Sequence, residues 1–108
     1  MEAERRAPDL LLIGGVSGSG KNVALAALGD AGYYAVNNLP PPLVLPTIDY
    51  LATAGQRRVA VSLDARIGSG LPGLRDLIGS ARAAGWNVTF LYLDTKTDRP
   101  WLQVGTEI

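Results

Sequence analysis

The sequence predicts an α/β fold in which a parallel sheet of about four strands is flanked by helices. Short, continuous apolar runs alternate along the chain with segments whose apolar residues recur at helical spacing. A continuous apolar run such as residues 10–13 is typical of a strand that is buried on both faces. Glycines follow the helical segments, as expected where helices end. This order favours parallel strands joined by right-handed helical crossovers.

Four apolar runs are the predicted strands, and three helices are expected between them. The strands are predicted at residues 10–13, 33–36, 58–64 and 88–94, and the helices at residues 21–31, 46–55 and 74–81. The second helix is placed from Pro46, whose fixed φ suits a first helical position. A turn is expected at residues 37–40, and a glycine- and proline-containing loop is expected between the third strand and the third helix.

Composition excludes several classes of function. The 108 residues suffice for one domain, and 47% of them are apolar, as in a globular protein. Basic and acidic residues number 10 each, so the chain lacks the broad basic surface that nucleic-acid binding normally needs. The absence of cysteine and histidine excludes disulfides, thiolate metal sites and a Ser-His-Asp hydrolase. No signal-peptide core follows the charged first residues, so a cytoplasmic location is expected.

A glycine-rich segment between the first strand and the first helix carries the strongest functional signal. It matches the phosphate-loop pattern G-x-x-x-x-G-K-[ST] at every defined position except the last. Its glycines let backbone N–H groups curl around phosphate oxygens, and the following helix adds its positive N-terminal end. A flexible Gly/Ser turn is the alternative interpretation. The residues expected to bind the phosphates of ATP or GTP are Gly15, Val16, Ser17, Gly18, Ser19, Gly20, Lys21 and Asn22.

This motif narrows the predicted fold to a three-layer, P-loop NTPase-like parallel sheet, truncated to about four strands. Lys21 is expected to reach the β- and γ-phosphates as a point charge and is one of two predicted catalytic residues. Asn22 stands where the pattern has a Ser or Thr that ligates Mg²⁺. An amide oxygen can ligate Mg²⁺, but the octahedral geometry is strict. We therefore expect Asn22 to leave phosphate binding intact and to weaken Mg²⁺ positioning and turnover.

Other polar residues follow the predicted strands. Asp64 is the second predicted catalytic residue and, with Asn22, a predicted Mg²⁺ ligand; a helix-capping or turn aspartate is the alternative. Asn37 and Asn38 are interpreted as turn residues, because asparagine tolerates left-handed backbone; contact with a substrate is the alternative. Asp94 is a weaker acid candidate. Because ligands collect at the carboxyl ends of parallel strands, all these residues are expected at one edge of the sheet.

Several segments of the chain resemble the N-terminal part of the RapZ/YvcJ family of P-loop nucleotide-binding proteins, which includes RNase adapters. The phosphate loop and the helix after it carry part of the resemblance. V-N-N-L-P is similar to the family's V-D-N-L-P, D-A-R-I to its D-x-R-N, and L-Y-L-D to a strand ending in L-D-A. The matching segments are residues 16–21, 23–28, 32–34, 36–40, 62–67 and 91–94, within a span of about residues 9–95.

The resemblance implies ATP binding at residues 15–22, GTP binding with help from a second segment, and ATPase and GTPase activities. The residues of that second segment are Asp64, Ala65, Arg66 and Ile67. In some members the resemblance also implies adapting a small regulatory RNA to an endoribonuclease. The expected RNA-binding C-terminal domain is absent from these 108 residues. Asn22 replaces the family's Ser, Asn37 replaces an acid, and Ile67 stands where the family has Asn, which weakens the implied GTP contact.

The sequence thus predicts a nucleotide-binding regulatory domain with weak or impaired ATPase and GTPase activity. Residues 1–8 are expected to be a flexible extension, residues 9–94 a partial P-loop domain, and residues 95–108 a divergent tail. Two alternatives stay open. One is a P-loop small-molecule kinase, which needs an arginine-bearing lid, and the other is an inactive truncated fragment. Self-association through the exposed edge of the short sheet is also expected.

Overall fold

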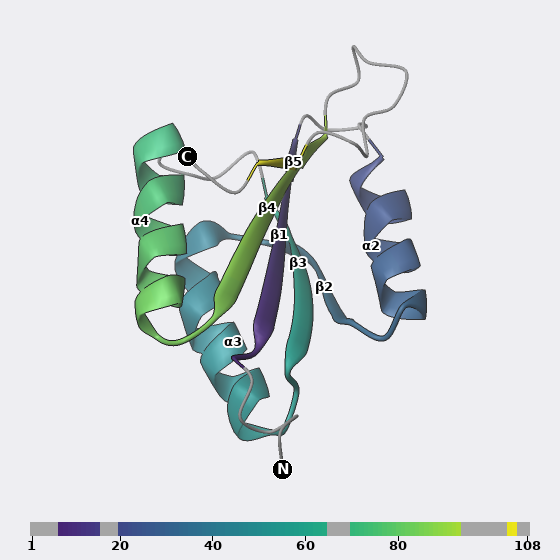
Figure 1. Cartoon of the computed structure of the whole chain (residues 1–108). Helices are drawn as coiled ribbons and strands as arrows, with labels where there is room; N and C mark the ends of the chain where they lie inside the picture. The colour runs from purple at the N-terminus through teal and green to yellow at the C-terminus, as the bar shows by residue number, and fades with distance from the viewer. Residues whose placement is uncertain (1–6, 16–19, 65–69, 94–103, 106–108) are drawn as a thin grey trace.

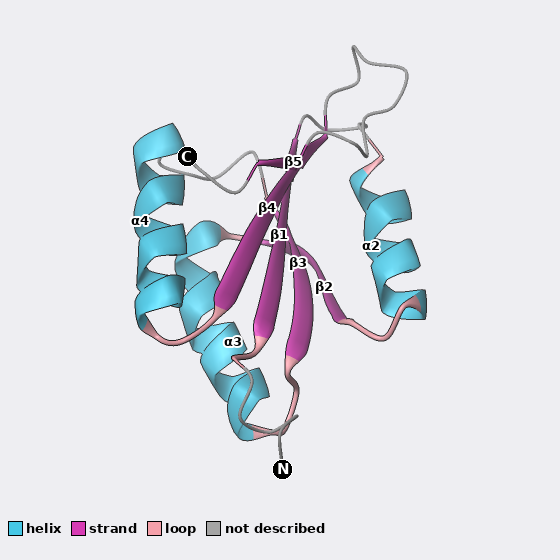
Figure 2. Cartoon of the chain, viewed as in Figure 1, coloured by secondary structure: helices cyan, strands magenta, loops and turns pink. Residues whose placement is uncertain are grey.

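The computed structural model of the chain describes residues 7–15, 20–64, 70–93 and 104–105, and it confirms the predicted α/β fold. Helix α2 (Lys21–Asp30) covers one face of a sheet, and helices α3 (Val44–Thr53) and α4 (Gly70–Ala83) cover the other (Figures 1 and 2). A 3₁₀ turn, η1 (Pro41–Leu43), leads into α3. These helices and the sheet between them form the three predicted layers.

The sheet has the strand order β2-β3-β1-β4-β5. Its four main strands are β1 (Asp9–Gly15), β2 (Tyr34–Leu39), β3 (Arg58–Leu63) and β4 (Asn87–Leu93), and they are all parallel. β5 (Val104–Gly105) is short and runs antiparallel to β4, against Phe90 and Leu91. This short strand is not among the four strands that the sequence predicts. Two residues are too few to show any periodicity in a sequence.

Several element boundaries differ from the sequence prediction, and the largest differences are at the end of β2 and at the starts of α3 and α4. Residues 37–38 lie inside β2 as an irregularity, and β2 continues to Leu39, which pairs with Leu63. α3 begins at Val44 because the prolines of η1 start the helical turn earlier than Pro46, which lies within the first turn and needs no N–H acceptor there. α4 begins at Gly70, so residues 70–73 are helical rather than part of the expected loop; proline is tolerated in a first helical turn.

The core lies on both faces of the sheet, because the strands are buried on both sides. Side chains alternate along β3, so that Val59 and Val61 pack toward α3 and α4, whereas Ala60 packs toward α2. The larger cluster joins β-strand residues to α3 and α4, and the smaller one joins β1, β3 and β4 to Leu25 of α2. The described helices are all shorter or more polar than a membrane-spanning segment needs to be.

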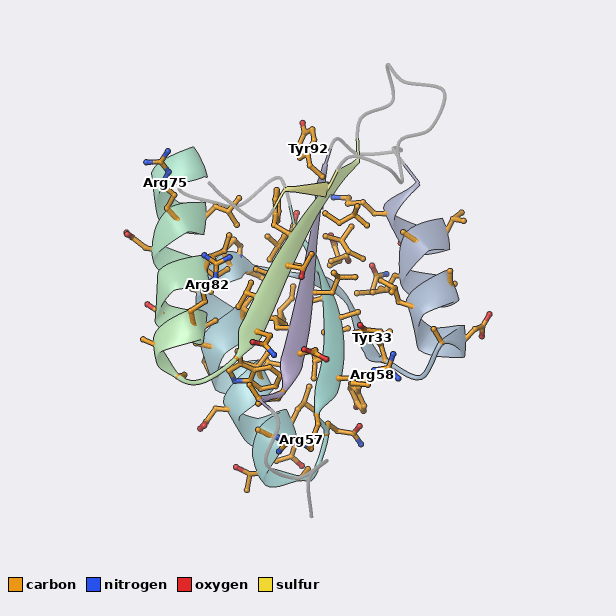
Figure 3. The ribbon with its side chains drawn as sticks, in the orientation of Figure 1. Tyr33, Arg57, Arg58, Arg75, Arg82 and Tyr92 are labelled. Atoms are coloured by element: carbon orange, nitrogen blue, oxygen red, sulfur yellow. The ribbon has the colours of Figure 1, made fainter. Side chains whose placement is uncertain are left out.

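At the amino end of the sheet, contacts between segments that are distant in sequence hold the strands together. The guanidinium of Arg58, at the start of β3, lies 4.4 Å from the ring centre of Tyr33, just after α2 (Figure 3). The backbone N–H of Asp9 donates to Arg57 O, and that of Asn87 donates to Pro8 O, both at 2.8 Å. These contacts fix the starting points of β1, β3 and β4, and therefore where their carboxyl ends lie.

Gly14 is held by close packing against a buried ring, which predicts a large cost for any added side-chain atom. A Cβ at this position would lie 2.8 Å from Cζ of Phe90, which is itself buried. We expect Gly14→Ala to lower the free energy of unfolding by about 1–3 kcal/mol in urea denaturation, because overpacking forces a rearrangement. Combining Gly14→Ala with Phe90→Leu, which shortens the opposing side chain, should recover part of the loss.

The matched control is Gly79→Ala in α4, where an added Cβ meets nothing within 4 Å. This change should raise stability by about 0.5–1 kcal/mol, because alanine is the better helix former. If Gly14→Ala and Gly79→Ala gave the same unfolding midpoint, the packing argument for Gly14 would be wrong.

Candidate functional site

The carboxyl ends of β1 and β3 are neighbours at the point where the chain changes direction across the sheet. The chain leaving β1 enters α2 on one face, and the chain leaving β3 later enters α4 on the opposite face (Figure 1). β1 and β3 pair in parallel, from Asp9 opposite Arg58 to Ile13 opposite Ser62. In open α/β sheets, the crevice outside such a switch point is where ligands bind. The candidate site is therefore this edge of β2, β3 and β1 together with the start of α2.

The start of α2 leaves several backbone donors without a partner inside the helix. The first helical hydrogen bond runs from the N–H of Ala24 to Gly20 O at 3.0 Å. The N–H groups of the three residues before Ala24 therefore have no acceptor within the helix. No side chain caps the helix start, and its first turn carries no acidic residue. The positive end of the helix is thus left to attract an anion.

Gly20 sets the direction in which the chain enters α2. Its φ is 90°, in the left-handed region that favours glycine over residues with a Cβ. An added Cβ at Gly20 would meet nothing within 4 Å, so backbone conformation and not crowding explains the glycine. This supports the sequence interpretation of the second glycine of the motif as a residue needed for chain curvature.

Lys21 reaches from the start of α2 to the end of β3. Its ammonium Nζ donates a hydrogen bond to Leu63 O at 3.2 Å. Among the described residues this is the one partner of Lys21, and no carboxylate pairs with it. Because an ammonium has three N–H donors, two are left for a ligand at the carboxyl edge. The structure thus places the charged atom of the motif beside the strand that precedes Asp64.

Asp64 is buried at the same edge. It directly follows β3, is 6% exposed, and its backbone N–H donates to Leu39 O at 3.0 Å. This hydrogen bond ties the segment after β3 to the end of β2. The described residues contain no group of three or more acidic, histidine or cysteine side chains that could hold a metal. An Mg²⁺ ion here would therefore depend on one or two protein ligands and on oxygens of a bound phosphate, which is common for this ion.

A third polar group at this edge was not predicted from the sequence as part of a site. The hydroxyl of Ser62 is buried in β3, and it contacts two residues of β2. It accepts a hydrogen bond from the N–H of Asn38 at 2.6 Å and donates one to Oδ1 of Asn37 at 2.9 Å. The available signal was Ser62 itself, the single polar residue inside the apolar run of residues 59–63.

Asn37 and Asn38 form a bulge, which corrects their placement in a turn after the strand. Val36 pairs with Val61 and Leu39 with Leu63, so two residues of β2 stand opposite Ser62 alone. Asn38 has a φ of 58°, the left-handed conformation that asparagine tolerates. The left-handed conformation was therefore predicted correctly for Asn38 but not for Asn37, and the hydrogen bonds to Ser62 keep β2 paired beyond the bulge.

The structure brings together only part of the predicted site. Gly15, Gly20, Lys21, Asn22 and Asp64 lie in or next to the elements that meet at this edge, and Asn22 is exposed in the first turn of α2. The predicted site residues that lie outside the described residues are Val16, Ser17, Gly18, Ser19, Ala65, Arg66 and Ile67, together with the weaker candidate Asp94. The assignment of roles to individual site residues stays a prediction.

Known proteins share this sequence pattern. A family model described as RapZ-like N-terminal domain matches residues 8–99. A relative from Thiobacillus denitrificans is 41% identical over 88 residues, which are 82% of this chain and 32% of the relative. One from Azoarcus sp. is 44% identical over 89 residues, 82% and 30% of the two chains. One from Burkholderia multivorans is 50% identical over 88 residues, 81% and 29% of the two chains. All three carry the name nucleotide-binding protein, and the chain spans about a third of their length or slightly less.

The bulge at Asn38 generates a prediction about stability. A β-branched residue is strained at a φ of 58°, whereas glycine is not. We expect Asn38→Val to lower the free energy of unfolding by roughly 1–2 kcal/mol and Asn38→Gly to change it by less than about 0.5 kcal/mol in urea denaturation. Both variants keep the backbone N–H that donates to Ser62, so the comparison isolates backbone conformation. Equal losses for the two variants would show that the asparagine side chain, rather than its φ, matters.

Proposed function

We propose that this chain, which belongs to the RapZ-like N-terminal domain family, binds ATP or GTP by their phosphates at the start of α2. We further propose that it hydrolyses the bound nucleotide slowly, because it holds Mg²⁺ weakly. The name that its relatives carry, nucleotide-binding protein, supports the first half of this proposal. The proposal covers both nucleotides, because the proposed contacts of the described residues are to phosphates and not to adenine or guanine.

The position of the Lys21 ammonium, without a carboxylate partner among the described residues, is the observation that supports the proposal most strongly. Its ammonium lies at an uncapped helix start, within 3.2 Å of Leu63 O, and no carboxylate among the described residues neutralises it. A cation with unused donors, next to backbone N–H groups that also lack acceptors, suits a multiply charged anion such as a triphosphate. A flexible Gly/Ser turn would give no reason for a lysine to be held across the end of a neighbouring strand.

The proposed role of Mg²⁺ follows from the ligands at the edge. Asp64 would anchor the ion directly or through water, as buried acids at strand ends do in P-loop proteins. Asn22 would offer an amide oxygen on a longer side chain than Ser, in the exposed first turn of α2. When bound, Mg²⁺ would neutralise charge on the phosphates; Lys21 and the helix start would hold and orient them.

Slow hydrolysis is the expected consequence. The chain contains no histidine or cysteine that could act as a general base. Phosphoryl transfer depends mainly on positioning and on charge stabilisation, and the proposed weakness of the Asn22 contact would reduce both. We place any contact with RNA or an endoribonuclease outside this domain, because its equal numbers of basic and acidic residues give no broad positive surface.

Replacement of Lys21 tests the phosphate site directly. We expect Lys21→Ala to weaken the binding of fluorescent ATP and GTP analogues by at least tenfold, because a charge-assisted contact to phosphate is worth about 1.5–3 kcal/mol. The charge-matched control is Arg57→Ala, which removes one positive charge just before β3, at the opposite edge of the sheet (Figure 3). Its affinity should stay within about twofold of the wild-type value. Equal losses in both variants would indicate a general charge effect and contradict the proposed site.

Replacement of Asn22 tests the metal. Asn22→Ser restores the hydroxyl that the phosphate-loop pattern contains at this position. We expect this variant to bind ATP about equally well without Mg²⁺, to gain affinity on addition of Mg²⁺, and to hydrolyse ATP roughly tenfold faster. Isothermal titration and phosphate release measure these effects. If the wild-type chain already showed the same Mg²⁺-dependent gain as Asn22→Ser, Asn22 would not impair the metal site.

A further inference from the structure

The β2 bulge beside the proposed phosphate site contains a hydrogen-bonded chain with a defined direction. The backbone N–H of Asn38 donates to Oγ of Ser62 at 2.6 Å. A serine hydroxyl has a single proton, and this proton is donated to Oδ1 of Asn37 at 2.9 Å. Because Ser62 is 1% exposed, water cannot easily replace either bond. The chain therefore runs from backbone N–H to hydroxyl to amide oxygen.

This direction determines which end of the Asn37 amide faces a ligand. The oxygen is held by Ser62, so the nitrogen Nδ2, with two N–H donors, is the end that remains. Asn37 is exposed, and among the described residues Nδ2 has no acceptor. At this position the protein thus offers donors, which suit oxygen atoms of an anion and not a metal ion.

This hydrogen-bonded chain lies close to Lys21 and on the same side of the sheet as α2. Ser62 has the same alternation along β3 as Ala60, whose side chain packs in the cluster that contains Leu25 of α2. The next residue, Leu63, supplies the carbonyl that accepts from Nζ of Lys21. Asn37 and Lys21 are therefore both hydrogen-bonded to successive residues of β3 at its carboxyl end.

We propose that Asn37 contacts the ligand, donating from Nδ2 to a phosphoryl oxygen, and that Ser62 is the positioning residue that keeps the amide nitrogen outward. This inference rests on the proposed function and adds a second contact to it. The phosphoryl group is either the terminal phosphate of the bound nucleotide or a separate phosphate beside a bound nucleoside diphosphate. An aspartate at position 37 would accept the same Ser62 hydrogen bond but present a negative oxygen to the phosphate.

The experiment measures binding of ATP and ADP, and of inorganic phosphate to the ADP-saturated chain, by isothermal titration without Mg²⁺. We expect Asn37→Asp to weaken binding of ATP, or of the separate phosphate, about tenfold, because like charges would come close at a partly buried edge. ADP binding should change by less than about twofold. A loss confined to ATP identifies the terminal phosphate of the nucleotide as the group recognised, and a loss of phosphate binding to the ADP-saturated chain identifies a separate phosphate.

Ser62→Ala tests positioning. It leaves the Asn37 amide in place but free to turn, so the ratio of ATP to ADP affinity, or the affinity for the separate phosphate, should fall by roughly threefold. A merely structural role would lower ATP and ADP affinity equally. The charge control is Gln56→Glu, which adds the same charge at an exposed position two residues before β3 and should leave all affinities unchanged.

Four results would overturn the inference. Unchanged phosphate recognition in Asn37→Asp would do so, as would an equal loss in Gln56→Glu. An Asn37→Ala variant that loses affinity only when Mg²⁺ is present would show that Asn37 acts through a metal. A wild-type chain that binds neither ATP nor ADP would refute the proposed function as well, and this outcome is distinguished from the others because wild-type binding is measured in the same titrations.

Discussion

The parallel pairing of β1 between β3 and β4 is the constraint on which the rest of the structure depends. β1 pairs from Asp9 onward with both neighbours, so their carboxyl ends reach the same edge. Without this register, α2 would not begin beside the end of β3, and Lys21 could not reach Leu63 O. The close approach of Gly14 and the ring of Phe90 shows how little space this register leaves at the end of β1. The packing of the sheet therefore determines the geometry of the site.

The two edges of the sheet differ in how their backbone is satisfied. At the amino edge, the backbone N–H of Asp9 donates to Arg57 O, that of Asn87 donates to Pro8 O, and Arg58 stacks on Tyr33. At the carboxyl edge, Asn38 has a positive φ although it carries a Cβ, and the start of α2 has no side-chain cap. Irregular backbone with unused donors is costly unless something binds there. The contacts at the amino edge fix the strands from which the carboxyl edge is built.

Much of this arrangement could be predicted from the sequence. The four parallel strands and the start of α2 follow from apolar runs and from the spacing of Gly15, Gly20 and Lys21. The β2 bulge could not be placed, because it depends on Ser62, which is 25 residues from Asn37 in sequence. The start of α3 depended on which of several nearby prolines begins the helix, and local propensity does not decide that. The long-range partner of Lys21 was likewise invisible, since a backbone carbonyl has no sequence signature.

Net charge and local charge lead to different conclusions about this chain. The charges of ten basic and ten acidic residues cancel. This argues against binding of nucleic acid, whose phosphate backbone must be neutralised along its length. A nucleotide phosphate needs only a few donors in one place, and backbone N–H groups and an asparagine amide contribute none to the formal charge. The start of α2, Lys21 and Asn37 would together supply such donors at one edge. The selectivity of the proposed site for small phosphates over nucleic acid would then come from the direction of its donors, and composition alone could not reveal it.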